Sequence, residues 1–271
     1  MDQAVVRSVE DGGTTVRTSF RDGVGTIELS RPAVFNSVSR RMLSEIRDAI
    51  ATFERDGARA VLIAASGKNF CTGAALDEVE VVRGDEEELR DFLALGHSVL
   101  ARLEASPLPV VAAVQGLCLA GGIELVLACD VLFAAEDARF GDQHVAFGLI
   151  PGWGGSQRLT RTLGLRRALD LMYSARWIDA PTAMQWGLVN HVVPAARLRE
   201  DALAYAGQLA SRSRTGLAAI KRLARHAADA DQSLSDGLRL EQQEAVHVLI
   251  GIEVSEGLAA FRERRAPNFA G

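Results

Sequence analysis

The residues best suited to chemistry lie in one segment, Leu119 to Asp130, which contains two adjacent glycines and a glutamate. The apolar run Val110 to Val114 is typical of a buried strand, and the apolar stretch after Gly121 and Gly122 has the length of a helix. At such a strand-to-helix turn, the first backbone N–H groups lack intrahelical partners, and the helix dipole adds partial positive charge. Because glycine has no side chain, an anionic oxygen can approach these N–H groups closely.

Glu124 is the only charged residue between Gln115 and Asp130. It follows Gly121 by three residues, so the two are expected on the same face of the helix. An anion-binding amide beside a buried carboxylate suggests acid–base chemistry on a carbonyl compound. The alternative is structural, because a glutamate in the first turn also complements the helix dipole. A phosphate-binding loop is disfavoured, since Gly122 occupies the position of that motif's lysine.

A second glycine-containing loop, Asn69 to Ala74, follows another short apolar run, Ala60 to Ala64. This loop could supply a second backbone N–H to the same ligand oxygen. Two convergent N–H donors form an oxyanion hole, and each donor lowers a reaction barrier by roughly 3 kcal/mol. Taken alone, a loop of this composition is usually only a turn.

His144, in the segment Phe140 to Val145, is the third candidate for chemistry. Asp142 lies two residues before it and would point to the same side in an extended segment, where it could fix the imidazole tautomer. The alternative is a surface histidine or a buried one with a structural role. The remaining histidines show no metal-ligand spacing, so no metal site is expected; they are His97, His191, His226 and His247.

The surrounding pattern predicts the elements that would position these residues. Strands are expected at residues 15–20, 24–29, 60–64, 110–114, 131–135 and 189–193, with the main helices beginning after Ser39, at Asp85 and after Gly121. Strands alternating with helices indicate an α/β fold. We therefore divide the chain into a flexible tail at 1–13, a core at 14–194 and a C-terminal helical segment at 195–271.

Composition limits the class of protein. With 271 residues, 48% of them hydrophobic and 24% charged, the chain can bury a full core. A net charge of −5 argues against nucleic-acid binding. Three cysteines without metal or redox spacing fit buried thiols in a reducing compartment. The polar, acidic N-terminus and the lack of a long apolar window predict a cytoplasmic protein without a membrane span.

Together, four segments resemble the crotonase superfamily, also called the enoyl-CoA hydratase/isomerase family. The resemblance extends from the strand at Val24 to Phe269, nearly the whole chain. It implies a spiral of strand–strand–helix turns with a C-terminal helical segment, residues 195–271, that assembles trimers or pairs of trimers. The four segments are Asn69 to Leu76, Gln115 to Glu124, Phe140 to Gly155 and Ala260 to Arg265.

The resemblance also implies roles for individual residues. The N–H groups of Ala74 and Gly121 would hold the thioester oxygen of an acyl-CoA as it becomes an enolate. Glu124 matches the first of two acid–base glutamates in the family's hydratases, whereas His144 stands where the second is expected. The family's aspartate after the oxyanion alanine is also missing, with Ala75 in its place. Substrate contacts are expected from Ala33, Phe35, Cys71, Ala75, Leu76, Trp153, Phe261 and Arg264, the last two from a neighbouring subunit.

Trp153 occupies a position where the family often has a small residue. The indole could narrow the acyl pocket and favour short acyl chains, or it could simply cover the core. The sequence alone does not choose between these two roles.

The expected activity is hydration of a 2-enoyl-CoA in fatty-acid metabolism, by Glu124 with a neutral His144 that exchanges protons near neutrality. Because His144 replaces the second glutamate, alternatives remain: double-bond isomerisation, decarboxylation or C–C hydrolysis of a β-keto compound, and acyl-CoA binding without turnover. A serine peptidase is disfavoured because Ser156 lacks the second glycine of a nucleophile elbow. The expected partners are an acyl-CoA thioester and further copies of the chain, with no nucleic acid, membrane, metal or cofactor beyond the substrate's CoA.

Overall fold

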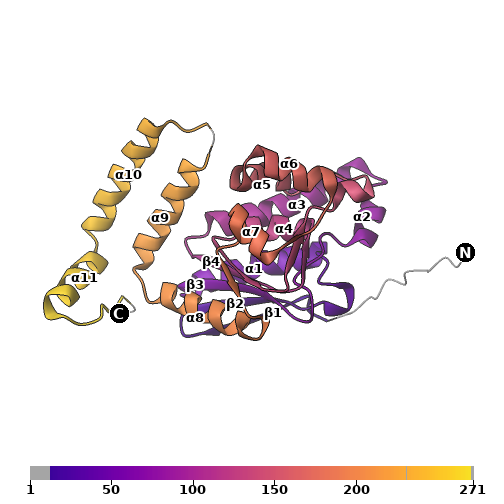
Figure 1. The fold of residues 1–271 in the computed structure, drawn as a ribbon. Coiled ribbons are helices and arrows are strands. Elements are labelled where there is room, and N and C mark those ends of the chain that lie inside the picture. Colours follow the sequence, from indigo (N-terminus) through magenta and orange to yellow (C-terminus); the bar gives the residue numbers. More distant parts are fainter. Residues whose placement is uncertain (1–12, 230, 270–271) are drawn as a thin grey trace, which may run out of the picture.

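A six-stranded sheet forms the centre of the protein (Figure 1). The structure is a computed structural model that describes residues 13–229 and 231–269, so the expected N-terminal tail lies outside the described residues except for Gly13. β1 pairs antiparallel with β2, and the other neighbouring pairs in this sheet are parallel. Across the sheet, the strands are β1 (Val16–Arg21), β2 (Val24–Leu29), β3 (Ala60–Ala65), β4 (Val110–Val114), β6 (Val131–Ala135) and β9 (His191–Val193).

Both faces of this sheet are covered, which explains why its inner strands are continuous apolar runs. In β3, Val61 and Ile63 join one hydrophobic cluster and Leu62 and Ala64 join the other, following the two-residue period of a strand. In the C-terminal helical segment, α8 (Leu198–Ala210) packs on the second face of the sheet. The covering helices are α1 (Arg40–Arg55) and α3 (Glu86–Ala105) on the first face and α8 on the second.

The main helices begin at the capping residues that the sequence indicates. Ser39 accepts a hydrogen bond from the Met42 N–H at the start of α1, at 3.1 Å. Asp85 accepts from the N–H groups of Glu87 and Glu88 at the start of α3. These bonds satisfy backbone donors that have no partner inside the helix. The predicted α/β alternation is confirmed.

A second sheet of three short strands, β5 (Leu117–Leu119), β7 (Arg139–Gly141) and β8 (Ile178–Asp179), is not predicted by the sequence. The sequence places the glycine pair directly after the Val110 run, but β4 is followed by a turn at Gly116 and then by β5. Strands of two or three residues are too short for a periodic pattern to reveal. The helix after β5 is α4 (Gly121–Leu127).

The segment from Phe140 to Ile150 contains the end of a strand and a short 3₁₀ helix. Phe140 is buried in β7, and η2 (His144–Phe147) is a short 3₁₀ helix. The remaining elements of the body are η1 (Pro32–Val34), α2 (Leu76–Val82), α5 (Gly155–Leu163), α6 (Leu165–Ser174), α7 (Ala180–Trp186) and η3 (Ala195–Arg197).

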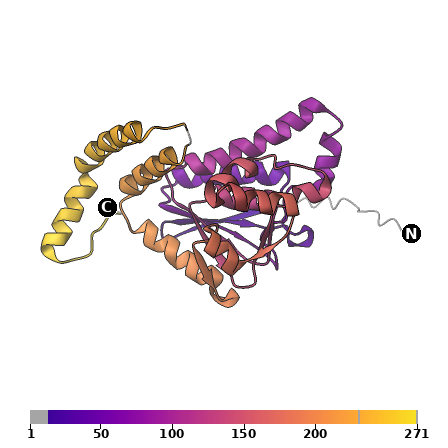
Figure 2. The same ribbon diagram turned by 45° about the horizontal axis from the view of Figure 1, so that its top comes forward.

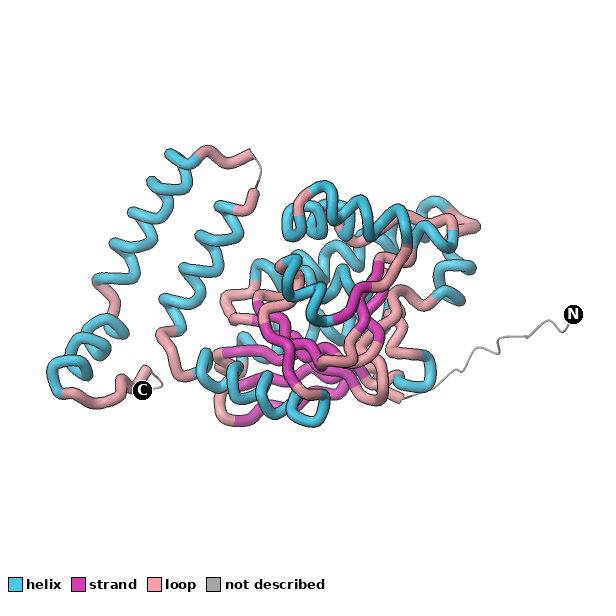
Figure 3. Tube along the Cα trace, viewed as in Figure 1, coloured by secondary structure: helices cyan, strands magenta, loops and turns pink. Residues whose placement is uncertain are grey.

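The chain ends in a helical arm, which we define as α10 (Leu234–Leu249) and α11 (Ile252–Glu263). The preceding helix, α9 (Arg214–Ala227), is tied to the body by Lys221 and Arg225, which both pair with Asp130. The arm stands away from the body (Figures 1 and 2) and contains no strand among its described residues (Figure 3). α10 buries none of its side chains, so the arm exposes apolar surface.

Within the described residues, no helix has the length and apolar character needed to cross a membrane. The three cysteines, Cys71, Cys118 and Cys129, are buried free thiols, as the sequence predicts. Burial raises the pKa of Cys71 to about 12, so its thiol stays protonated at neutral pH.

Candidate active site

Glu124 is the buried carboxylate around which the site is built. It lies in the first turn of α4, with 1% of its surface exposed. Its Oε1 accepts hydrogen bonds from the backbone N–H groups of Trp153 and Gly155, each at 2.7 Å. These bonds fix one carboxylate oxygen, while Oε2 is the oxygen nearer His144. The loop before α5 therefore aims the carboxylate.

Burial raises the pKa of Glu124 above its ordinary value, because the charged form loses solvation. The N–H groups of Gly155 and Trp153 and the charge of His144 stabilise the carboxylate and offset part of this effect. A carboxyl group with a raised pKa is a stronger base when ionised and holds its proton nearer neutrality. This environment favours a proton-exchanging role over one that only complements a helix dipole.

His144 begins η2, and Asp142 holds its ring. His144 Nδ1 is 2.9 Å from Asp142 Oδ1, and the same oxygen accepts from the His144 backbone N–H at 3.2 Å. Asp142 is 2% exposed, so the contact is shielded from water. Because a carboxylate only accepts, we assign the proton to Nδ1, which leaves Nε2 facing Glu124. The structure thus places Asp142 against the ring of His144, as the spacing of the two residues suggested.

The surroundings of His144 favour its protonated form. Burial alone would lower the pKa of His144, but the hydrogen bond and charge of Asp142, together with the charge of Glu124, raise it above its ordinary value. The neutral imidazole expected from the sequence follows from the ordinary pKa of histidine, which does not include the effect of these two carboxylates.

Glu124 Oε2 and His144 Nε2 are 3.7 Å apart, too far for a good direct hydrogen bond. A single water oxygen at an ordinary hydrogen-bond distance, about 2.8 Å, can contact both atoms at once. α4 supplies one group and the segment after β7 supplies the other. The pair can therefore hold a water molecule between a base and an acid.

Two backbone N–H groups, those of Ala74 and Gly121, lie close together near the N-terminus of α4. A Cβ atom on Gly121 would lie 3.2 Å from the Ala74 nitrogen, and one on Gly73 would lie 3.1 Å from the Gly121 nitrogen. Within the described part of the chain, neither the Ala74 N–H nor the Gly121 N–H donates a hydrogen bond. Both groups are thus available to one ligand oxygen, and the structure brings together the two loops that the sequence named.

Backbone strain and close packing hold these N–H groups in place. Ala120, the residue before Gly121, has φ 47° and ψ −118°, a conformation that is unfavourable for alanine. Its N–H donates to the Gly141 carbonyl at 3.0 Å, which ties the start of α4 to β7. A Cβ atom on Gly122 would overlap the Cys71 carbonyl oxygen, so only glycine lets α4 approach the neighbouring loop.

Trp153 fills the space next to the N–H groups of Ala74 and Gly121. It is 3% exposed, and its indole packs edge-on against Phe92 of α3, with ring centroids 5.4 Å apart. A Cβ atom on Gly96 would overlap the indole, and one on Gly121 would lie 2.8 Å from indole Cζ3. The Trp153 carbonyl accepts from Arg158 Nη1 at 2.7 Å. This residue therefore joins α3, α4 and α5.

The predicted substrate residues in the first half of the chain lie at or near the loop of residues 69–74. Phe35 follows η1 in a left-handed conformation, φ 55°, and is 54% exposed. Its carbonyl accepts from the Thr72 N–H at 3.2 Å, which places it against that loop. Ala33, in η1, is also exposed. Of the other three residues, Cys71 and Ala75 are buried and Leu76 is exposed.

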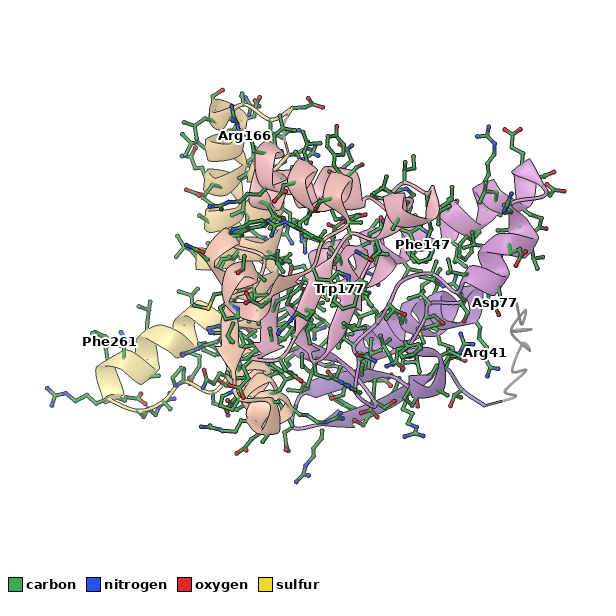
Figure 4. All side chains as sticks on the ribbon, turned by 45° about the vertical axis from the view of Figure 1, so that its right-hand side comes forward. Arg41, Asp77, Phe147, Arg166, Trp177 and Phe261 are labelled. Carbon is green, nitrogen blue, oxygen red and sulfur yellow. The ribbon has the colours of Figure 1, made fainter. Side chains whose placement is uncertain are left out.

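Phe261 and Arg264, at the end of α11, are not brought to the site within one chain. Phe261 is 82% exposed on the arm, and Figure 4 shows it far from Phe147, which shares η2 with His144. Arg264 ends α11 with a left-handed backbone, φ 56°. A contact between these residues and the site requires a second copy of the chain.

Sequence reasoning missed how Glu124 is aimed and what packs against Trp153. The aiming groups are the backbone N–H groups of Trp153 and Gly155, which carry no side-chain signature. Gly96 did carry a signal, because a glycine inside the helix predicted after Asp85 is unfavourable for that helix.

A cavity of about 710 Å³ between α3, α5 and α9 is separate from this site. Neither Glu124 nor His144 borders it. Among its lining residues, Glu104 pairs with both Arg158 and Arg225. The cavity at α9 is therefore bordered by ion pairs. The candidate site is assigned by its chemistry rather than by cavity size.

The sequence matches the model of one protein family, described as enoyl-CoA hydratase/isomerase, over residues 19–271. The probable enoyl-CoA hydratase echA8 of Mycobacterium tuberculosis is 38% identical over 249 residues, which span 91% of this chain and 94% of that protein. The mitochondrial enoyl-CoA hydratase of Pongo abelii is 34% identical, over 91% of this chain and 83% of that protein.

Solved structures of similar proteins share the fold. The enoyl-CoA hydratase from Bacillus anthracis aligns with a TM-score of 0.89 at 35% identity, covering 95% of this chain and 99% of that one. The enoyl-CoA hydratase from Polaromonas sp. JS666 aligns with a TM-score of 0.89 at 31% identity, covering 93% and 98%. Because each alignment spans more than nine-tenths of the chain, the likeness includes the body and the arm.

Proposed function

The chain belongs to the enoyl-CoA hydratase/isomerase family, and we propose that it adds water across the double bond of a 2-enoyl-CoA thioester. The crotonase-like fold expected from the sequence is confirmed by the structural neighbours. One observation carries the proposal: Glu124 Oε2 and His144 Nε2 lie 3.7 Å apart near two backbone N–H groups without acceptors among the described residues. That arrangement offers a base, an acid and an anion site together.

In the proposed reaction, the two side chains share one proton. Glu124, ionised, takes a proton from a water molecule held between it and His144, and the water oxygen bonds to the β-carbon of the substrate. The π electrons of the double bond move toward the thioester carbonyl, whose oxygen becomes an enolate oxygen. His144, protonated, then gives its Nε2 proton to the α-carbon. Glu124 is left protonated and His144 neutral, and a proton transfer between them restores the starting state.

The enolate oxygen is held by the N–H groups of Ala74 and Gly121. Each donor lowers the barrier by roughly 3 kcal/mol, because it is fixed in place before charge develops on the oxygen. The strained backbone at Ala120 and its bond to Gly141 support this role, since they orient the Gly121 N–H. Asp142 holds the imidazole and favours the protonated form that the last step needs.

The CoA part of the substrate lies, in this proposal, along Ala33, Phe35 and Leu76, which border the oxyanion loop. Phe261 and Arg264 of a neighbouring copy meet its nucleotide end, where an aromatic ring can stack and a guanidinium can bind phosphate. Their exposure on the arm supports an assembly into homotrimers or pairs of trimers. The protein acts in the cytoplasm, and it needs no cofactor beyond the CoA of its substrate.

The test is the product formed from crotonyl-CoA in water labelled with heavy oxygen and deuterium. We expect 3-hydroxybutyryl-CoA with heavy oxygen on the β-carbon and one stable deuterium on the α-carbon, measured by mass spectrometry and NMR. Deuterium incorporation with a shifted double bond and no heavy oxygen would identify an isomerase instead.

Two further outcomes would also overturn the proposal. If crotonyl-CoA is unchanged while a β-keto thioester loses carbon dioxide or is cleaved, the enzyme is a decarboxylase or C–C hydrolase. If both esters bind and neither reacts, the protein is an acyl-CoA binder without turnover.

A further inference from the structure

The indole of Trp153 forms a wall beside the oxyanion N–H groups. Its Cζ3 would lie 2.8 Å from a Cβ atom on Gly121, and a Cβ at that position would also lie 3.2 Å from the Ala74 nitrogen. The backbone N–H of Trp153 binds Glu124 at 2.7 Å. In the proposed binding mode, the thioester oxygen lies between the two N–H groups and the β-carbon faces Glu124. The first carbons of the acyl chain therefore lie next to the indole ring.

The wall is fixed by its surroundings and cannot swing aside freely. Phe92 packs against one side of the ring, 5.4 Å between centroids, and Gly96 of α3 lies against its Nε1 edge. Arg158 holds the Trp153 carbonyl at 2.7 Å and is itself paired with Glu104 in a two-bond contact. Because helix α3 supplies both packing residues, the position of the ring is set by that helix.

The size of the indole, rather than its polar group, explains its presence. Trp153 Nε1 is buried and has no hydrogen-bond partner among the described residues. A buried donor without a partner is unfavourable, and a phenylalanine would avoid that cost while keeping the contact with Phe92. The larger ring fills the additional space that Gly96 leaves open.

We propose that Trp153, positioned by Gly96, closes the acyl side of the site and makes this protein selective for short 2-enoyl chains. The inference rests on the proposed hydration and adds the substrate class to it. A closed apolar pocket discriminates against a chain that is one methylene too long by roughly 10- to 200-fold in kcat/KM. Longer chains then have no space beyond the ring.

The first measurement is kcat/KM for hydration of esters from crotonyl-CoA to dodecenoyl-CoA. In the unaltered protein, kcat/KM should fall by at least roughly 10-fold between crotonyl-CoA and octenoyl-CoA. Trp153→Ala should raise the octenoyl-to-crotonyl ratio by roughly 10-fold or more. Trp186→Ala is the matched control: that indole packs on Arg167 and Arg176, and its loss should leave the ratio unchanged.

The second measurement tests the contact between the ring and α3. Gly96→Ala places a Cβ where the indole lies, so the ring must shift, and we expect crotonyl-CoA hydration to fall by roughly 10-fold or more. Alanine is ordinarily the better helix former, so helix propensity cannot explain a loss. The double variant Gly96→Ala/Trp153→Ala removes the overlap and should recover hydration relative to Gly96→Ala.

These results separate the failure of this inference from failure of the proposed function. If the unaltered protein hydrates no enoyl-CoA, the proposed function is wrong. If it hydrates crotonyl-CoA and dodecenoyl-CoA equally well, or if Trp153→Ala leaves the ratio unchanged, only this inference is wrong. Should Trp153→Ala lose turnover, calorimetric binding of butyryl-CoA and octanoyl-CoA decides: equal affinity ratios in both proteins would overturn the inference.

Discussion

At the scale of single residues, the pair Glu124 and His144 differs from a pair of glutamates, because His144 carries a positive charge when it is protonated. Glu124 and His144 both have raised pKa values, the first because of burial and the second because two carboxylates outweigh burial. The proposed active state holds one proton on the pair. Activity should therefore be lost at low pH, when the pair binds a second proton, and at high pH, when it loses its only proton. The acid limit of activity lies above the ordinary pKa of a glutamate, and the alkaline limit lies above the ordinary pKa of a histidine.

Asp142→Asn tests this account through the pH dependence of kcat/KM. Asp142 raises the pKa of His144, so its replacement lowers that pKa, and the protonated form is lost at a lower pH. We expect the alkaline limb of the profile to move to lower pH, with a plateau reduced by less than about 10²-fold, since His144 remains. Asp170→Asn, at a surface carboxylate paired with Arg176, is the control. An alkaline limb that stays in place in Asp142→Asn contradicts the role given to His144.

Much of the site at this scale could be predicted, and the remainder has a physical explanation. Glu124 is visible in the sequence because it is the only charged residue in an apolar segment, and Asp142 and His144 are visible through their two-residue spacing. The bonds from Trp153 and Gly155 to Glu124 were not visible, because backbone groups are the same in every residue. Asp142, two positions away, is the main cause of the raised pKa of His144, and only the smaller contribution of Glu124 comes from a residue twenty positions away in the chain.

At the scale of elements, the site is held by the approach of α4 to the loop of residues 69–74. The sequence predicts both pieces, since each combines an apolar strand with glycines. It does not predict the short strand β5. It also does not predict the backbone β-bridge that pairs Cys71 with Cys118 and so aligns the loop with β5. Such pairings join residues far apart in the chain, and three-residue strands have no period to recognise.

Gly122→Ala tests whether this approach positions the N–H groups of Ala74 and Gly121 for the role proposed for them. The added Cβ would overlap the Cys71 carbonyl, and overpacking of this kind costs about 1–3 kcal/mol of unfolding free energy. We expect Tm to fall by roughly 2–4 °C for each kcal/mol, and crotonyl-CoA turnover to fall by roughly 10²-fold as a donor moves.

Gly207→Ala in α8 is the matched control, because a Cβ there meets nothing within 4 Å. This control should keep its turnover and lose no stability, since alanine favours a helix. Unchanged turnover in Gly122→Ala would show that the spacing between α4 and the loop does not control the N–H groups.

At the scale of the whole molecule, the arm leaves apolar side chains without partners in one chain. Ile250, which follows α10, is 80% exposed, and Ile252, the first residue of α11, is 85% exposed. The sequence predicts the helical character of this segment, because its apolar residues recur at helical spacing. It does not show that α10 and α11 stand away from the body, because that depends on how α9 is anchored by Lys221 and Arg225.

The proposed assembly predicts a mass in solution of three or six times that of one chain, measured by sedimentation equilibrium. Replacing Ile250 and Ile252 by aspartate should shift the equilibrium toward single chains, because charges are then buried without partners. Leu203→Asp on α8, an exposed apolar position of the body, is the control and should leave the mass unchanged. A single-chain mass for the unaltered protein would contradict the assembly.

The central claim is that Glu124 and His144 together carry the hydration, and it is tested most directly by kcat for crotonyl-CoA in Glu124→Gln and His144→Gln. Each substitution keeps a polar side chain but removes a proton-exchanging group, so we expect losses of roughly 10²- to 10⁴-fold. The double variant should lose little more than either single one, because the two groups act as a unit. If either single variant keeps a kcat within about threefold of the unaltered protein while remaining folded, the assignment of the pair is wrong.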